Sequence, residues 1–354
     1  MNAILSQYDE NKKTCDAYAK SLESLIGNLL SHNNIKVHSI SARVKEKDSL
    51  VRKIARKDSY SHLDDITDII GIRIITHYSD EVDSISKIIE AEFSIDTENS
   101  IDKRKTLEPD RFGYLSLHYV ISLSEERSML TEYSNFKNLK AELQIRSILQ
   151  HTWAEIEHDI GYKSGVGVPH EVRRQFSRLA GLLELGDSEF INIREKLKNY
   201  EERVSLDIKN NATEVMLDKI SILEYSKSSD TITEICLSVK EKFNLTLTWE
   251  DTEFLNLSMH NLEYINVKTI SELDELIKLH KENIIKKCGI VAKRVLEKNN
   301  ATSISGTLIF IYLTQSIVAR EGERDEIREY IDTLKIRNDN IENFITELIE
   351  TFSQ

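Results

Sequence analysis

The sequence predicts an α/β protein in which helices and strands alternate over the first half and helices dominate the second half. Segments rich in β-branched residues, or alternating between apolar and polar residues, are typical of strands. Apolar residues spaced three or four positions apart are typical of helices. Strands are expected at 69–76, 112–123 and 139–146, and helices at 3–30, 80–92 and 147–161. Their alternation indicates an α/β core over residues 35–165.

The remaining segments are assigned from the same two patterns. Residues 40–57 (ISARVKEKDSLVRKIARK) are expected to form a short, very basic helix, and the polar segment 96–111 is expected to be a loop. Residues 244–267 fit a strand or a helix equally well. Further helices are expected at 171–205, 269–298, 305–320, 323–335 and 339–352. Thr269 and Glu272 form a capping-box pattern, which predicts the start of the helix at 269.

The length of 354 residues favours two domains. Small polar residues cluster at 226–230 (SKSSD), which makes this segment the best linker candidate. We therefore expect a first domain at 1–226 and a mainly helical second domain at 227–354. Packing on the first domain is the favoured use of these helices, while formation of a homo-oligomer and recognition of a partner stay open.

The composition indicates a cytoplasmic protein without a membrane partner. The N-terminus lacks an apolar signal stretch, and the strongest apolar run, 307–313, is far shorter than the ~20 residues that span a bilayer. Cys15, Cys236 and Cys288 lie far apart and lack CxxC spacing, which fits a reducing compartment.

The charge of the chain bears on its partners. The formal net charge is −13, whereas proteins that grip nucleic acid along their length usually show a basic stripe. A local nucleotide pocket is therefore favoured over an extended nucleic-acid footprint. One segment concentrates positive charge that could neutralise a triphosphate: Arg43, Lys45, Lys47, Arg52, Lys53, Arg56 and Lys57. A solvated helix face explains this cluster equally well.

Two of the expected strands each have an apolar face and a polar face, because successive side chains of a strand point to opposite sides. The polar faces carry Tyr114, Ser116 and His118 in one strand and Glu142, Gln144 and Arg146 in the other. A plain solvated face usually carries Lys and Glu instead, so these residues favour a functional face. Solvent exposure remains the alternative.

Two carboxylates are candidates for chemistry. Asp68 precedes a strand, at the edge where a side chain can reach a cleft, and Glu142 lies on a polar strand face. Transfer of phosphoryl groups from ATP needs hard oxygen ligands for magnesium, and one or two carboxylates usually supply them. A single Asp before a strand is more often a turn residue, so the pair alone is weak evidence. No glycine-rich phosphate loop of the GxxxxGK[ST] or GxGxxG type occurs, so side chains would have to hold the phosphates.

Five segments in the expected order resemble the synthetase domain of the RelA/SpoT alarmone enzymes. They are RVKEKDSLVRK (43–53), DIIGIR (68–73), GYLSLH (113–118), ELQIRS (142–147) and HTWAEIEHDIGYK (151–163). The resemblance implies a mixed β-sheet flanked by helices, akin to nucleotidyltransferases. It also implies a synthetase without its own hydrolase domain, because about forty residues precede the first segment.

The resemblance also implies a role for each matching residue. Asp68 would be the main Mg²⁺ ligand, and Glu142 a second ligand or the base that prepares the 3′-hydroxyl. Arg43 would stack on the adenine of ATP. The remaining ATP-binding positions would be Lys45, Ser49, Lys53 and Arg73, and the acceptor nucleotide would be bound by Lys103, Arg104, Tyr114, His118, Gln144 and Arg146.

Three functions remain open at this point. The first is a GTP pyrophosphokinase (ATP:GTP 3′-diphosphotransferase) that uses ATP and GDP or GTP to make AMP and (p)ppGpp. The second keeps this chemistry but transfers to the 3′ end of tRNA or to adenine nucleotides, with the C-terminal region as a regulator. Phe112 stands where the family often has Asn in the acceptor pocket, so the acceptor is undecided. The third is a catalytically silent binding protein, against which the presence of both Asp68 and Glu142 argues.

Overall fold

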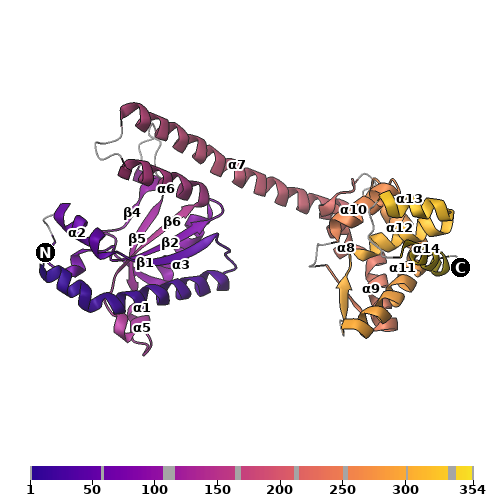
Figure 1. The fold of residues 1–354 in the computed structure, drawn as a ribbon, viewed down its shortest axis with the longest axis horizontal. Helices are drawn as coiled ribbons and strands as arrows, with labels where there is room; N and C mark the ends of the chain where they lie inside the picture. Colours follow the sequence, from indigo (N-terminus) through magenta and orange to yellow (C-terminus); the bar gives the residue numbers. More distant parts are fainter. Residues whose placement is uncertain are drawn as a thin grey trace. The chain divides into compact units, whose positions relative to one another are not determined.

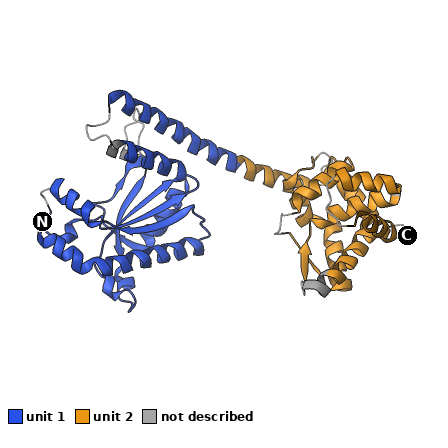
Figure 2. Ribbon diagram, viewed as in Figure 1, with its two compact units in different colours: residues 1–195 blue, residues 196–354 orange. Residues whose placement is uncertain are grey.

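The computed structural model divides the chain into two compact units, residues 1–195 and 196–354 (Figure 2). It describes residues 2–56, 60–106, 116–163, 169–210, 215–249, 254–299, 302–333 and 340–352. Within the described residues, no helix combines the length and the apolar character needed to span a membrane.

The first unit is built on a mixed six-stranded sheet, as expected (Figure 1). Its strands are β1 (Ser39–Val44), β2 (Ile70–Thr76), β3 (Phe93–Ile95), β4 (Ile101–Asp102), β5 (Leu117–Leu123) and β6 (Ala141–Ser147). The order is β1-β2-β6-β5-β3, with β4 also paired to β5. Among the described strands of this sheet, β2 and β6 pair in parallel, and the other pairs are antiparallel.

Helices surround this sheet. They are α1 (Asn2–His32), α2 (Lys47–Arg56), α3 (Glu81–Glu92), α4 (Lys103–Thr106), α5 (Glu125–Ser128), α6 (Ile148–Lys163) and α7 (His170–Lys209), with 3-10 turns at Leu63–Asp65 and Ser134–Phe136. The expected helices at 3–30, 80–92, 147–161 and 171–205 are therefore confirmed, as are the strands at 69–76 and 139–146. Within 112–123, residues 112–115 lie outside the described residues, and Leu117–Leu123 form β5.

The expected helix at 40–57 is wrong over its first half. Residues 39–44 form β1, which pairs antiparallel with β2, and a helix begins only at Lys47. The apolar side chains of Ile40, Ala42 and Val44 alternate with Ser41 and Arg43, which is the period of a strand. The expected loop at 96–111 likewise contains the short elements β4 and α4.

One face of the sheet forms the core of the first unit. Ile70, Ile72 and Ile74 of β2 and Leu143 and Ile145 of β6 are at most 1% exposed on this face. Helices α1 and α3 lie against the sheet (Figure 1). Their buried side chains belong to the same core: Tyr18, Leu22, Ile26, Val82, Ile85 and Ile89. The opposite face carries the polar side chains of β1, β2, β5 and β6, and α6 contacts it through β2 and β6.

The second unit is mainly helical, as expected. Its elements are α8 (Lys219–Ser228), α9 (Asp230–Phe243), β7 (Thr246–Thr248), α10 (Leu255–Tyr264), α11 (Ile270–Asn299), β8 (Ser303–Ser305), α12 (Leu308–Glu321), α13 (Arg324–Thr333) and α14 (Ile341–Phe352). Residues 244–267 thus contain both a strand and a helix. The predicted capping box forms, because Thr269 N donates to Glu272 and Glu272 N donates to the Thr269 hydroxyl.

The boundary between the two compact units lies within α7, whereas the sequence suggested a boundary at residue 226. Residues 226–228 belong to α8, and Ser229 is the N-cap of α9, where its side chain accepts a hydrogen bond from Ile232 N. Serine is favoured at helix N-caps as well as in loops, so the cluster marks a break between two packed helices. Tyr225 and Ile232, on either side of that break, are buried in one core.

Candidate active site

Asp68 lies in the segment that leads into β2, between two lysine side chains. Its Oδ2 atom is 3.0 Å from Lys45 Nζ and 2.8 Å from Lys53 Nζ, and the side chain is 19% exposed. Its Oδ1 atom is buried and has no hydrogen-bond partner among the described residues. A buried carboxylate oxygen without a partner is costly, so this atom is suited to an additional positive ligand.

Both lysines are held in place by the fold. Lys45 follows β1, and its backbone is fixed on both sides: its N–H donates to Ile69 O at 2.8 Å, and the Tyr8 hydroxyl donates to its carbonyl at 2.6 Å. Lys53 lies on α2, which is anchored by the buried side chains of Leu50 and Ile54. Three distant segments, α1, β1 and α2, therefore fix the surroundings of Asp68.

Glu142 on β6 belongs to a second polar group on the same face. His118 Nδ1 on β5 lies 2.8 Å from Glu142 Oε1, and Gln144 Nε2 donates to the same atom at 3.2 Å. The hydrogen bond from His118, helped by Gln144 and by the charge of Lys53, lowers the pKa of Glu142 to about 2 although burial opposes the shift. Glu142 is therefore ionised at neutral pH, and Lys53 lies near both carboxylates.

The register of the strands explains why these groups share a face. Arg43 of β1 is opposite Gly71 of β2, and Gly71 is opposite Glu142 of β6. In the next polar row Arg73 is opposite Gln144, which is opposite His118. The Arg43 side chain lies directly beside Gly71, since a Cβ atom built on Gly71 would be in ordinary van der Waals contact with Arg43 Cγ, at 3.8 Å.

The polar face continues onto α6 through a cluster centred on Glu155. Glu155 Oε1 is 3.0 Å from Arg73 Nη1, 3.5 Å from Arg146 Nη2 and 3.7 Å from His151 Nδ1. Burial, together with the charges of Arg146 and Arg73, lowers the pKa of His151. Glu155 is absent from the predicted site, although its i, i+4 spacing from His151 placed both on one helix face.

The other residues predicted for the site do not form one cluster in the structure. Ser49 accepts a hydrogen bond from Arg52 on α2, and Lys103 is placed beside β5 because its N–H donates to Ser116 O. Arg104 is bound to Asp102 and also to Asp83 of α3, at 2.8 Å. It is thus neutralised by two carboxylates. Tyr114 lies outside the described residues.

The arrangement combines ionised carboxylates with cations around one sheet face, which suits the binding of a phosphorylated ligand together with a divalent cation. Among the described residues, no group of three or more His, Cys, Asp and Glu side chains is arranged to hold a metal ion by itself. Magnesium commonly uses one or two protein carboxylates and takes its other ligands from water and substrate phosphates. Asp68 and Glu142 fit that pattern, and the unpaired Asp68 Oδ1 offers a ligand atom.

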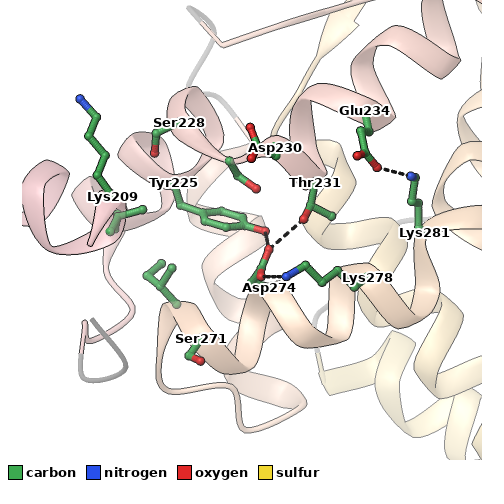
Figure 3. Close-up of a pocket in the computed structure, with 13 residues that line it drawn as sticks. Lys209, Tyr225, Ser228, Asp230, Thr231, Glu234, Ser271, Asp274, Lys278 and Lys281 are labelled. Atoms are coloured by element: carbon green, nitrogen blue, oxygen red, sulfur yellow. Dashed lines mark hydrogen bonds and ion pairs between the residues drawn. The ribbon is translucent and has the colours of Figure 1, made fainter. Parts of the chain in front are cut away.

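The second unit contains a separate polar cavity of about 780 Å³ (Figure 3). At one wall the Asp274 carboxylate accepts hydrogen bonds from Tyr225 and Thr231 and pairs with Lys278 at 2.6 Å. Lys281 pairs with Glu234 nearby. These charged groups are satisfied by one another, and none of the predicted site residues belongs to this unit.

Comparison with known proteins shows which proteins the first unit is similar to. Residues 42–166 match the family profile described as "Region found in RelA / SpoT proteins". The chain is 27% identical over 172 residues to GTP pyrophosphokinase YwaC of Bacillus subtilis (strain 168), covering 48% of this chain and 79% of that protein. It is 28% identical over 162 residues to GTP pyrophosphokinase YjbM of the same organism, covering 45% and 72%.

Among solved structures, the small alarmone synthetase 1 from Bacillus subtilis matches with a TM-score of 0.46 and 22% identity, over 55% of this chain and 99% of that chain. The family match coincides with the segments that build the polar sheet face, from β1 through α6. Residues 42–166 of this chain therefore match the region found in RelA/SpoT proteins.

Proposed function

We propose that the first unit transfers the β,γ-pyrophosphate of ATP to the 3′-hydroxyl of GDP or GTP, which yields AMP and ppGpp or pppGpp. The observation that carries this proposal is the position of Asp68 between Lys45 and Lys53, with Lys53 also acting on Glu142. Acid groups for a cation and basic groups for phosphates thus adjoin each other, as pyrophosphate transfer requires. The two relatives named GTP pyrophosphokinase support the choice of acceptor.

Asp68 and Glu142 would hold Mg²⁺. When bound, Mg²⁺ neutralises charge on the phosphates and favours ionisation of the attacking hydroxyl. Neighbouring side chains prepare both carboxylates for this role. Lys45 and Lys53 compensate the charge of Asp68, and the hydrogen bonds from β5 and β6 keep Glu142 ionised.

The side chains around Asp68 would bind ATP. Arg43 is exposed above Gly71, where its planar guanidinium is able to stack on a base. Lys45, Lys53 and Arg73 would contact the phosphates, with Ser49 at the start of α2. Because Lys45 and Lys53 pair with Asp68 and Arg73 pairs with Glu155, ATP must exchange these ion pairs for contacts with its own phosphates.

His118, Gln144 and Arg146 would orient the acceptor nucleotide beside Glu142. His118 and Gln144 already share the Glu142 carboxylate, which fixes their side chains on the sheet face. Lys103 and Tyr114 complete the proposed acceptor site, with Tyr114 stacking on the base. Arg104 is the least suited of these residues to bind the acceptor, since Asp102 and Asp83 already neutralise its charge.

The test is transfer from ATP labelled at the β or γ position, in Mg²⁺, to GDP, GTP, ADP or uncharged tRNA in separate reactions. We expect labelled ppGpp from GDP and pppGpp from GTP, with one AMP formed per product. If the label is transferred to tRNA or to an adenine nucleotide instead, that molecule is the acceptor in place of GDP and GTP. Tight nucleotide binding without any product in all four reactions would indicate a silent binding protein and would refute the proposal.

Matched variants assign the activity to this site. Asp68→Asn and Asp96→Asn remove one charge each at side chains of equal exposure, 19%, and both partners are lysines. We expect Asp68→Asn to lose transfer and Asp96→Asn, which lies beyond β3, to retain it. Loss of transfer in both variants, with folded proteins by circular dichroism, would mean that the chosen carboxylate is not specific to the reaction.

A further inference from the structure

A buried carboxylate lies where α7 contacts the beginning of α6. Asp187 of α7 is 4% exposed, and its Oδ2 atom accepts a hydrogen bond from the Ser147 hydroxyl at 2.7 Å. Burial raises the pKa of Asp187, although the hydrogen bond from Ser147 and the nearby Gln150 amide act in the opposite direction. A buried acid group costs stability unless its surroundings compensate it, so packing alone does not explain its presence.

Helix propensity does not explain the residues at this point of α7 either. Gly186 and Asp187 lie in the interior of a 40-residue helix, where both residue types are unfavourable. Their contacts with other elements account for them. A Cβ atom on Gly186 would lie 3.3 Å from Leu149 Cδ1 of α6, so glycine allows the two helices to approach closely. The pair Gly186–Asp187 therefore brings a carboxylate of α7 to the first turn of α6.

Ser147 connects this carboxylate to the junction between β6 and α6. It is the last residue of β6 and 1% exposed, and its Oγ atom accepts a hydrogen bond from Gln150 N at 3.2 Å, which is the contact that a helix N-cap makes. A serine hydroxyl has one proton and two lone pairs. Because the proton is donated to Asp187, a lone pair remains for the Gln150 N–H. Asp187 thus fixes the orientation of the group that caps α6.

The same junction carries a residue of the candidate active site. Arg146 of β6 directly precedes Ser147 and is 3% exposed, and its Nη2 atom lies 3.5 Å from Glu155 Oε1 of α6. A shift of the junction would therefore move a side chain that the proposed function assigns to the acceptor nucleotide. The lysines assigned to ATP lie on other segments, since Lys45 follows β1 and Lys53 belongs to α2.

We propose that Asp187 is a positioning residue for the acceptor nucleotide: through Ser147 it fixes the junction between β6 and α6, and with it the side chain of Arg146. This role rests on the function proposed above and adds to it a residue of α7. Asp187 lies beyond residues 42–166, so the match to the RelA/SpoT region does not assign it. Loss of its hydrogen bond should weaken binding of the acceptor and leave binding of ATP unchanged.

Steady-state transfer to GDP by the full chain tests this role, and the Kd for GDP by titration calorimetry in Mg²⁺ gives the same comparison without turnover. Asp187→Ala and Ser147→Ala should each raise the KM for GDP about tenfold, because a displaced side chain loses its contact, while the KM for ATP changes less than about twofold. The double variant should stay near the single variants and not reach about 100-fold, because both residues act through one hydrogen bond. Asp187→Asn keeps an acceptor oxygen for Ser147 and should recover most of the affinity for GDP.

The matched control is Glu189→Ala, which removes an exposed acid from the same helix and should leave both KM values unchanged. Circular dichroism and urea unfolding establish that each variant is folded. If Asp187→Ala does not fold, the double variant replaces it, because that variant leaves neither partner of the hydrogen bond buried alone. An unchanged KM for GDP in a folded variant, an equal rise in the KM for ATP, or multiplied effects in the double variant would overturn this role of Asp187. Failure of the unmodified chain to transfer to GDP would instead contradict the proposed function, and the Kd for GDP would then decide the role of Asp187.

Discussion

The two faces of the six-stranded sheet are made by the same strands but serve different purposes. On one face Ile72 and Leu143 are at most 1% exposed and join the core with α1 and α3. On the other face the neighbouring residues Arg73 and Glu142 form ion pairs and hydrogen bonds around the candidate active site. Neighbouring residues of one strand therefore belong either to the buried core or to the candidate active site, because adjacent side chains of a strand point in opposite directions. Substitutions on the two faces should therefore affect different measurements.

The largest expected effect is on the polar face, at Asp68. Asp68→Asn removes the charge that the proposed Mg²⁺ site needs while keeping the side-chain shape, so turnover should fall at least ~100-fold. The unfolding midpoint should change little, because the variant loses the ion pairs with Lys45 and Lys53 but also removes charge from the buried Oδ1 atom, which has no hydrogen-bond partner among the described residues. Initial rates of AMP formation at saturating nucleotide, with unfolding curves of the same protein, give both quantities. A variant with unchanged turnover would remove Asp68 from the chemistry.

A pair of adjacent substitutions compares the faces directly. Ile72→Ala should lower the free energy of unfolding of the first unit by about 2–5 kcal/mol, because it empties space in a packed core. Arg73→Ala should lower it by less than about 1 kcal/mol, since its partner Glu155 is 53% exposed, yet it should weaken ATP binding.

Urea unfolding followed by tryptophan fluorescence makes this comparison specific to the first unit. The chain has two tryptophans, Trp153 in α6 and Trp249 in the second unit, so a Trp249→Phe background reports the first unit alone. Equal losses of stability in Ile72→Ala and Arg73→Ala would contradict the view that one face stabilises the fold while the other binds ligands.

A third prediction concerns pH and Glu142. Its pKa in the folded chain is about 2, below the ordinary 4.5, so its ionised form stabilises the fold above pH 4.5 and this contribution is lost as the pH falls toward 2. Glu142→Gln should therefore cost about 1–3 kcal/mol at pH 7 and progressively less below pH 4.5. Urea unfolding of both proteins with a chelator present, at pH 7 and at pH 3, measures the difference. An equal cost at both pH values would show that the carboxylate charge is not the cause.

The smallest expected effect is at the outer end of the polar face. Glu155 binds Arg73 in the ligand-free chain and would compete with the phosphates of ATP for it. Glu155→Gln should lower the KM for ATP about two- to fivefold, which corresponds to about 0.4–1 kcal/mol, with turnover nearly unchanged. Glu157→Gln, an exposed neighbour on the same helix, is the matched control. A raised KM in Glu155→Gln would mean that Glu155 holds Arg73 in its binding position.

Most of the elements could be predicted from the sequence, because apolar spacing is a local property of each segment. The strand at 70–76 and the helix at 270–299 with its capping box are examples. The prediction failed at β1, where the charges of residues 43–57 suggested a basic helix and concealed the alternation of Ile40, Ala42 and Val44. Ile156 and Ile160 of α6 have the apolar spacing of a buried helix face, yet they are 51% and 41% exposed.

The candidate site was predictable in part. The parity of β5 and β6 placed His118, Glu142 and Gln144 on one face, and the structure brings them into contact. Tyr8 and Glu155 were not predicted as parts of the site, because their contributions are contacts with residues distant in the sequence: Tyr8 binds the backbone of Lys45, and Glu155 binds Arg73. No local pattern encodes such a contact.

The sequence by itself determined which side chains share a face of each strand and helix, since those relations follow from the geometry of one turn or one pleat. Only the tertiary structure decided which strands are neighbours. The parallel pairing of β2 with β6 aligns Gly71 with Glu142 and Arg73 with Gln144, and α2 carries Lys53 to Asp68. That arrangement depends on which apolar faces bury one another across the whole unit, which is a property of the packed chain and not of any single segment.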